Sequence, residues 1–136
     1  MEFTIETVAL NYPIVVQLGI RTLDVASKAI FEMYAQNVCQ QLEWNNGSTA
    51  TNFAKDGATK LIRERSRTGV VGAAILFGIC IRQQLDWGNG GYATEVAEMA
   101  ARVILPSAGG EGIQQCQRLF QMCIDQQLEW GEWWLC

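Results

Sequence analysis

The chain has 136 residues, of which 49% are apolar and 18% are charged, so it can bury a core and lacks the composition of a disordered protein. Its formal net charge of −4 argues against a general nucleic-acid binder, which is normally basic. The longest apolar run, Val70 to Ile81, is shorter than the roughly 18 residues that cross a bilayer. The N-terminus shows no basic region followed by an apolar stretch. We therefore expect one cytoplasmic domain over residues 1–136, with no membrane span.

A five-residue phrase, Gln-Gln-Leu-acid-Trp, occurs three times. Its tryptophans are Trp44, Trp87 and Trp130, so the spacing is 43 residues both times. Apolar residues four apart precede the phrases, at positions 30, 34, 38 and 42 in the first copy, and this is the spacing of a helix face. Each copy is therefore predicted to end with one long helix, preceded by a second helix.

In chain order, the pattern predicts helices at approximately 3–18, 21–44, 50–66, 69–87, 92–105 and 111–130. The first helix is expected to be short or kinked, because proline interrupts a helix interior at Pro13. Leu10, Ile14 and Leu18 match the apolar face of the third helix 43 residues later, so the first unit is expected to begin near the N-terminus.

Helix pairs of this kind cannot bury their apolar faces alone, so neighbouring units stack. We expect an all-α fold of three tandem helix-pair repeats, approximately 1–47, 48–90 and 91–136, that form a six-helix bundle or a short HEAT-like solenoid. The 43-residue period lies in the range of HEAT and armadillo repeats. The similarity is one of architecture, since the signature phrase of neither family is present.

The copies differ most on the side of the fourth helix that lies away from the shared stripe. Val71 and Ile75 stand there with Ile79, whereas the other two copies have polar residues at most of the matching positions. A helix that is apolar all round is usually buried all round. The alternative is that these three residues line a surface for a partner or for a second copy of the chain.

Tryptophans supply two further candidate sites. Trp44, Trp87 and Trp130 either close helix ends by packing on neighbours or line an apolar ligand pocket between repeats. The C-terminal Trp133 and Trp134 have no counterpart in the earlier copies. They either fold over the last unit as a lid or anchor a partner, because tryptophan is enriched in binding hot spots.

Basic residues gather in the third predicted helix, where Lys60, Arg63 and Arg67 share one face of the segment 55–67. They are candidates for a polyanion or nucleic-acid contact. The alternative is a solvated face, since cationic side chains near the C-terminus of a helix are favoured by its dipole.

The chain has no histidine, which removes the commonest general base and most zinc sites. We predict no catalytic activity, no metal and no cofactor. The leading functional hypothesis is a protein–protein interaction module that binds another protein or itself as a homo-oligomer. The alternatives are a small-ligand binder with a tryptophan-lined pocket and a polyanion binder that uses the basic helix.

Overall fold

The structure, a computed structural model, describes residues 4–130, apart from the side chains at positions 107 and 108. Over these residues it is all helical, with no strand, which confirms the predicted all-α class. Its elements are α1 (Ile5–Asn11), α2 (Ile14–Leu18), a short 3-10 helix η1 (Ile20–Thr22), α3 (Val25–Glu43), α4 (Gly47–Asp86) and α5 (Gly90–Glu129).

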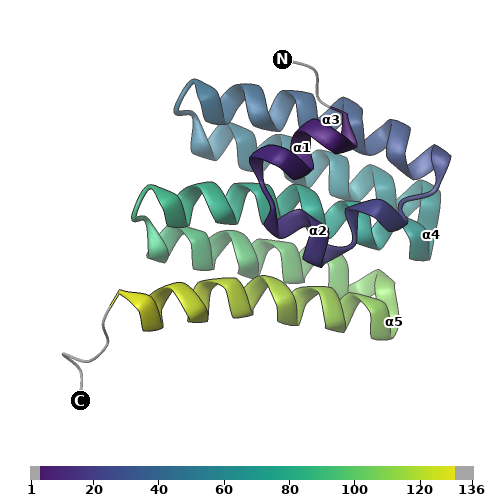
Figure 1. The fold of residues 1–136 in the computed structure, drawn as a ribbon. Coiled ribbons are helices and arrows are strands. Elements are labelled where there is room, and N and C mark those ends of the chain that lie inside the picture. The colour runs from purple at the N-terminus through teal and green to yellow at the C-terminus, as the bar shows by residue number, and fades with distance from the viewer. Residues whose placement is uncertain (1–3, 131–136) are drawn as a thin grey trace.

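A sharp bend divides each of the two longest helices into halves that run back alongside each other (Figure 1). The bend in α4 is at Ser66 (φ 49°, ψ −122°), and the bend in α5 is at Gly109 (φ 55°, ψ −143°). Residues with a side chain rarely adopt such a positive φ. The four halves, residues 47–65, 67–86, 90–108 and 110–129, correspond to the last four predicted helices.

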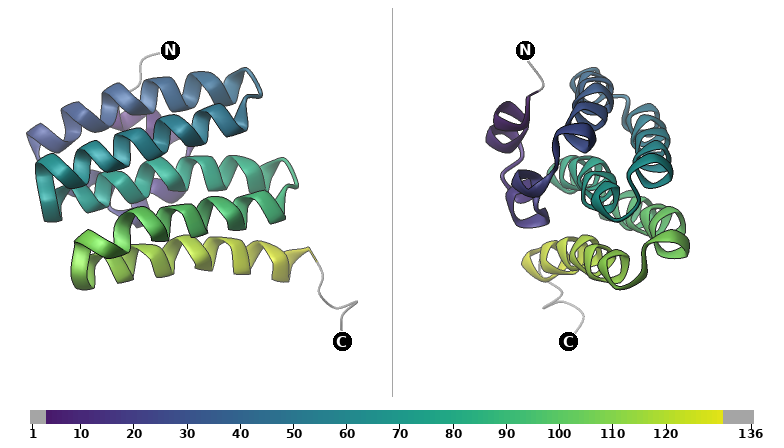
Figure 2. Two further views of the ribbon diagram at one scale, coloured as in Figure 1. Left: turned by 180° about the vertical axis from the view of Figure 1, so that it is seen from behind. Right: turned by 90° about the vertical axis from the view of Figure 1, so that its right-hand side faces the viewer.

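The helices form three layers, seen end-on in Figure 2. The middle layer contains α3 and the second halves of α4 and α5, side by side. The first halves of α4 and α5 cover one face of this layer, and α1 with α2 covers the other. The second half of α4 is therefore enclosed on both faces, and every residue from 72 to 81 is buried.

The predicted break near Pro13 is present. The helix α1 ends at Asn11, Tyr12 is not helical (φ −132°, ψ 76°), and Pro13 stands at the start of α2. Proline suits this position because the first residues of a helix have no partner for their N–H groups. The predicted single helix over 3–18 is thus two short ones.

The N-terminal segment does not pack as the apolar pattern suggested. Leu18 is buried against Gly78, where an added Cβ would lie 2.6 Å from the Leu18 Cδ1. Leu10, which the pattern placed on the same face, is exposed. The segment lies across the middle layer on the side opposite the first halves of α4 and α5 (Figure 2).

One stretch of α4 passes a length and composition test for a membrane span. An 18-residue window in this helix has a mean hydropathy of 1.4, and 78% of the window is buried inside the protein. The core helix of a compact fold passes the same test. The burial of this window is the pattern expected of such a core helix.

The bend in α4 brings Gly69 against the carbonyl oxygen of Leu61, which a Cβ at position 69 would contact. We predict that Gly69→Ala lowers the free energy of unfolding by about 2–3 kcal/mol, because overpacking against backbone outweighs the gain in helix propensity. The control is Gly91→Ala, since Gly91 is helical and a Cβ there would meet nothing within 4 Å. Urea unfolding followed by circular dichroism measures both, and equal stability of the two variants would contradict the prediction.

Candidate interaction surface

The repeated phrase forms a C-terminal helix cap. At the end of α3, the residue after Trp44 is Asn45, whose φ of 66° lies in the left-handed region. The backbone N–H of Asn46 then donates to the Gln41 carbonyl at 2.8 Å, and the Asn46 side-chain amide donates to the Gln41 Oε1 at 3.2 Å. This backbone pattern is a Schellman motif, which satisfies carbonyls left open at a helix end.

The end of α4 has the same C-terminal cap. Gly88 has φ 81°, and the Asn89 backbone and side chain bond to Gln84 at 2.8 and 3.0 Å. Gln84 is buried and lies against Gly47, the first residue of α4. The second glutamine of each phrase, bonded to the asparagine that follows the left-handed residue, therefore ends the helix in these two copies.

The three tryptophans of the phrase do not form a pocket with one another. Trp87 lies against Gly47, where a Cβ would be 3.6 Å from its Cζ3, and Trp130 lies against Gly90 in the same way at 2.9 Å. Each ring thus packs on the first turn of the long helix that it ends. Trp44 is the most exposed of the three. Trp87 and Trp130 therefore lie against the preceding half of their own helix.

The proposed partner surface on the middle helix is covered within the chain. Ile75 and Ile79 are fully buried, and Val71 is partly buried, with its Cγ1 3.3 Å from an ideal Cβ at Gly19. The suggestion that Ile75 and Ile79 line a surface is therefore corrected: the segment from α2 to η1 lies over this helix (Figure 1). The other suggested anchors, Trp133 and Trp134, lie outside the described residues.

The basic face is partly neutralised by its own helix. The Lys60 Nζ lies 2.6 Å from the Glu64 Oε2, and the Arg63 Nη2 lies 3.7 Å from the same oxygen. Arg67 is exposed. Because Lys60 and Arg63 share one carboxylate, the positive charge available to a polyanion at this face is smaller than the sequence suggested.

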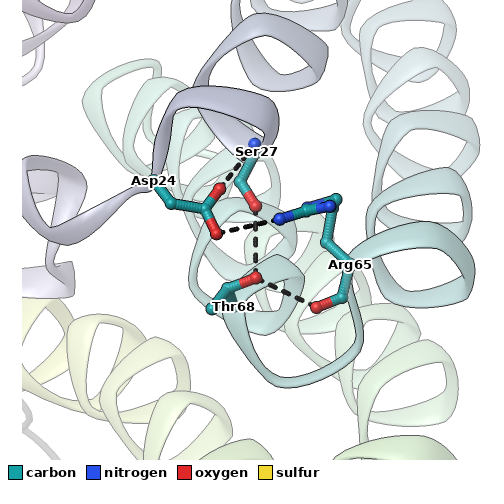
Figure 3. Close-up of polar contacts among 4 residues, drawn as sticks. All are labelled: Asp24, Ser27, Arg65 and Thr68. Carbon is teal, nitrogen blue, oxygen red and sulfur yellow. Dashed lines mark hydrogen bonds and ion pairs between the residues drawn. The ribbon is translucent and has the colours of Figure 1, made fainter.

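Arg65, in the same basic stretch, belongs to a polar cluster at the bend of α4 (Figure 3). Its Nη2 donates to the Asp24 Oδ2 at 3.1 Å, and the Asp24 Oδ1 accepts from the Ser27 backbone N–H at 2.8 Å. The Ser27 hydroxyl bonds to Thr68 at 3.4 Å. Asp24 thereby caps α3 and ties its start to the bend of α4.

An exposed apolar face lies on the second half of α5. Ile113, Ile124 and Leu128 are 53%, 50% and 66% exposed. The residues 43 positions earlier in α4 are Val70, Ile81 and Leu85, with exposures of 0%, 0% and 2%. We call Ile113, Phe120, Ile124 and Leu128 the open face of α5.

The difference follows from the order of the helices. The face of α3 that contains Val38 and Leu42 is buried, and α4 packs on α3. The equivalent face of α4 is buried, and α5 packs on α4. In the described part of the chain, no further helix follows α5 (Figure 2). The open face therefore corresponds to a surface on which the next helix packs in α3 and α4, but no described helix packs on it in α5.

This surface was not among the sites predicted from the sequence. The signal was present, because positions 113, 124 and 128 are apolar in the third copy as they are at the matching positions of the second. The same apolar pattern occurs on faces that are buried, however. An exposed face can be told from a buried one only when it is known which helix packs on which.

The described residues contain no group of three or more cysteine, aspartate or glutamate side chains placed to hold a metal ion. The four cysteines at positions 39, 80, 116 and 123 are buried and free. Comparison with models of protein families, with curated proteins and with solved structures gave no match.

The Asp24 cluster predicts a pH-dependent stability. The Ser27 backbone N–H, the Ser27 hydroxyl and the Arg65 guanidinium lower the pKa of Asp24 from 3.8 to about 2. Since the pKa is depressed in the folded state, the stabilisation is complete above about pH 3.8 and is lost as the pH falls through about 2. We predict that Asp24→Asn, which keeps a capping side chain, lowers the urea midpoint at pH 6 and that the difference shrinks towards pH 2.

The matched control is Asp56→Asn, because Asp56 is exposed and has no ion pair among the described residues. Its urea midpoint should stay close to that of the unchanged chain at pH 6. An Asp24→Asn loss that is equal at pH 6 and pH 2 would show that the carboxylate charge is not responsible.

Proposed function

We propose that this chain is a protein–protein interaction module built from three helix-pair units of 43 residues. The bends at Ser66 and Gly109 are 43 residues apart, and so are the left-handed residues Asn45 and Gly88. The hydroxyls of Thr51 and Thr94 each donate to the carbonyl four residues earlier, at 2.9 and 3.0 Å. These matching features support a short open solenoid, since a closed bundle would leave no apolar face at its end.

The binding site in this proposal is the open face of α5. Apolar side chains that stay in water lose the roughly 1.5–3 kcal/mol that full burial of each contributes. Three such side chains in register on one helix face are the anchors that a partner would bury. The single observation that carries the proposal is the contrast in exposure between Ile124 or Leu128 and the buried Ile81 or Leu85.

The occupant that fits is an amphipathic helix of another protein with small residues on its apolar face. The first halves of α4 and α5 show which helices cover this kind of surface. They bury alanines spaced three or four apart against their neighbours, namely Ala50, Ala54 and Ala58 in α4 and Ala93, Ala97 and Ala100 in α5. Small side chains let two helix backbones approach closely, so a partner helix with the same spacing fits the same geometry.

The other two hypotheses have less support. A polyanion site would use Lys60 and Arg63, which already contact Glu64. A tryptophan-lined pocket would need Trp44, Trp87 and Trp130 to converge, whereas they stand at three separate helix ends. Self-association remains an outcome of the experiment below, with the open face as its contact surface.

A peptide test addresses the open face directly. The probe is a labelled synthetic peptide of residues 47–65, the first half of α4, with a scrambled peptide as the comparison. We predict that the full chain binds this peptide, and that Ile124→Lys weakens binding about tenfold or more because a hot-spot side chain is replaced by a charge. Fluorescence anisotropy measures the affinity.

The matched control variant is Val25→Lys, which makes the same kind of change at an exposed apolar residue at the start of α3. It should bind the peptide as the unchanged chain does. Equal binding by Ile124→Lys and the unchanged chain would refute the site. A dimer in solution that Ile124→Lys dissociates would identify a second copy as the occupant, and stronger peptide binding by a Trp133→Ala, Trp134→Ala variant would identify the chain's own tail. Either result would overturn the partner-helix proposal.

A further inference from the structure

A second feature, away from the open face of α5, is a cavity of about 270 Å³ beneath the N-terminal segment. It lies where α1 and Tyr12 meet the C-terminal ends of α3 and α4. Its lining residues are Val8, Asn11, Tyr12, Cys39, Glu43, Gln83 and Asp86. Three of them, Glu43, Gln83 and Asp86, belong to the repeated phrase, so the phrase supplies polar residues to a cavity although its tryptophans do not.

The inner wall of this cavity is apolar and aromatic. Val8 and Cys39 are buried, and the half-buried Tyr12 stands between the N-terminal segment and α4. The Tyr12 hydroxyl is protonated and donates a hydrogen bond to the Gln83 Oε1 at 3.4 Å. Burial raises the pKa of Tyr12, so the hydroxyl keeps its proton at neutral pH.

The outer part of the cavity carries two carboxylates. Asp86 is paired with Arg82 at 3.0 Å, whereas Glu43 has no ion pair among the described residues. Both side chains are exposed, and both raise the pKa of Tyr12 through their charge, although less than burial does. The mouth of the cavity therefore carries negative charge, and the Glu43 carboxylate there has no ion pair among the described residues.

The Cys39 thiol belongs to the apolar inner wall of the cavity. It is 95% buried, since its exposure is 5%, and it lines the cavity. A buried thiol packs as a small apolar group and needs no hydrogen-bond partner. Burial also raises the pKa of Cys39 to about 12, so this thiol stays neutral and unreactive.

We infer that this cavity binds a small organic cation, an ammonium group on a short apolar body. The ammonium group lies at the mouth between Glu43 and Asp86, and the apolar body contacts Val8, Cys39 and the Tyr12 ring. Charge complementarity excludes an anion. A bare metal ion lacks a suitable set of ligands in the described residues. An aromatic ring beside carboxylates is the arrangement that recognises alkylammonium groups.

Choline and its neutral isostere 3,3-dimethylbutan-1-ol form a matched pair of probes. We predict that the full chain binds choline and binds the neutral alcohol more weakly, with chemical-shift changes in the NMR signals of Val8 and Tyr12. Glu43→Gln should weaken choline binding about three- to fivefold, the range of a partly exposed ion pair. Binding is measured at low ionic strength, because salt screens the attraction.

The matched control is Glu95→Gln, which removes an exposed carboxylate from the first half of α5, away from the cavity. Its choline affinity should equal that of the unchanged chain. Tyr12→Phe keeps the ring and removes only the bond to Gln83, so it should bind choline nearly as well. Equal binding of choline and the alcohol, or an unchanged affinity in Glu43→Gln, would overturn the inference.

Discussion

The arrangement of the helices depends on the bend at Ser66. Without it, α4 would be a straight rod of 40 residues, about 60 Å long, and its second half could not lie beside its first. A residue with a side chain in such a conformation costs about 1–3 kcal/mol. Burial of one large apolar side chain contributes a similar amount, and the bend allows Leu61 and Val70, among others, to be fully buried. The strain is therefore offset by packing close to the bend itself.

The cluster around Asp24 strengthens the same place. Asp24 caps α3 and accepts a bond from Arg65. The Thr68 hydroxyl accepts from the Ser27 hydroxyl and donates to the Arg65 carbonyl (Figure 3). Two segments that are 41 residues apart are thereby joined where the chain reverses. The bend in α5 uses glycine instead, which adopts a positive φ without the same cost.

The sequence was sufficient to predict the helices from α3 onward, whereas the predicted helix over 3–18 is two short helices whose placement the sequence did not indicate. Apolar spacing and the 43-residue period located the breaks near residues 66 and 109, since equivalent positions must turn in equivalent ways. Periodicity also showed that the segment from Leu10 to Leu18 has an apolar side. It could not show which face of the middle layer this side covers, because both faces of the second half of α4 are apolar. The cavity beneath Tyr12 results from that placement, so the sequence pattern could not predict it either.

The two ends of the array differ in a way that favours α5 as the binding end. The outward side of α3 presents Val25, Met33 and Trp44 together with small or polar residues such as Ala29 and Gln36. The open face of α5 presents isoleucine, leucine and phenylalanine side chains at helical spacing. Burial of alanine and glutamine contributes much less than burial of isoleucine and leucine. A helix that could dock at either end would therefore gain more at α5.

The proposed ammonium ligand would compensate the acidic residue of the repeated phrase at one of its three positions. Glu43, Asp86 and Glu129 stand in the last turns of α3, α4 and α5, where the helix dipole disfavours negative charge by about 0.3–1 kcal/mol. Asp86 is compensated by Arg82, and Glu129 accepts a bond from Gln126 at 3.0 Å. Glu43 has no ion pair among the described residues, and no basic residue stands between Gln40 and Asn46 in the sequence. An ammonium ligand at the mouth of the cavity would supply the positive charge that this helix end lacks.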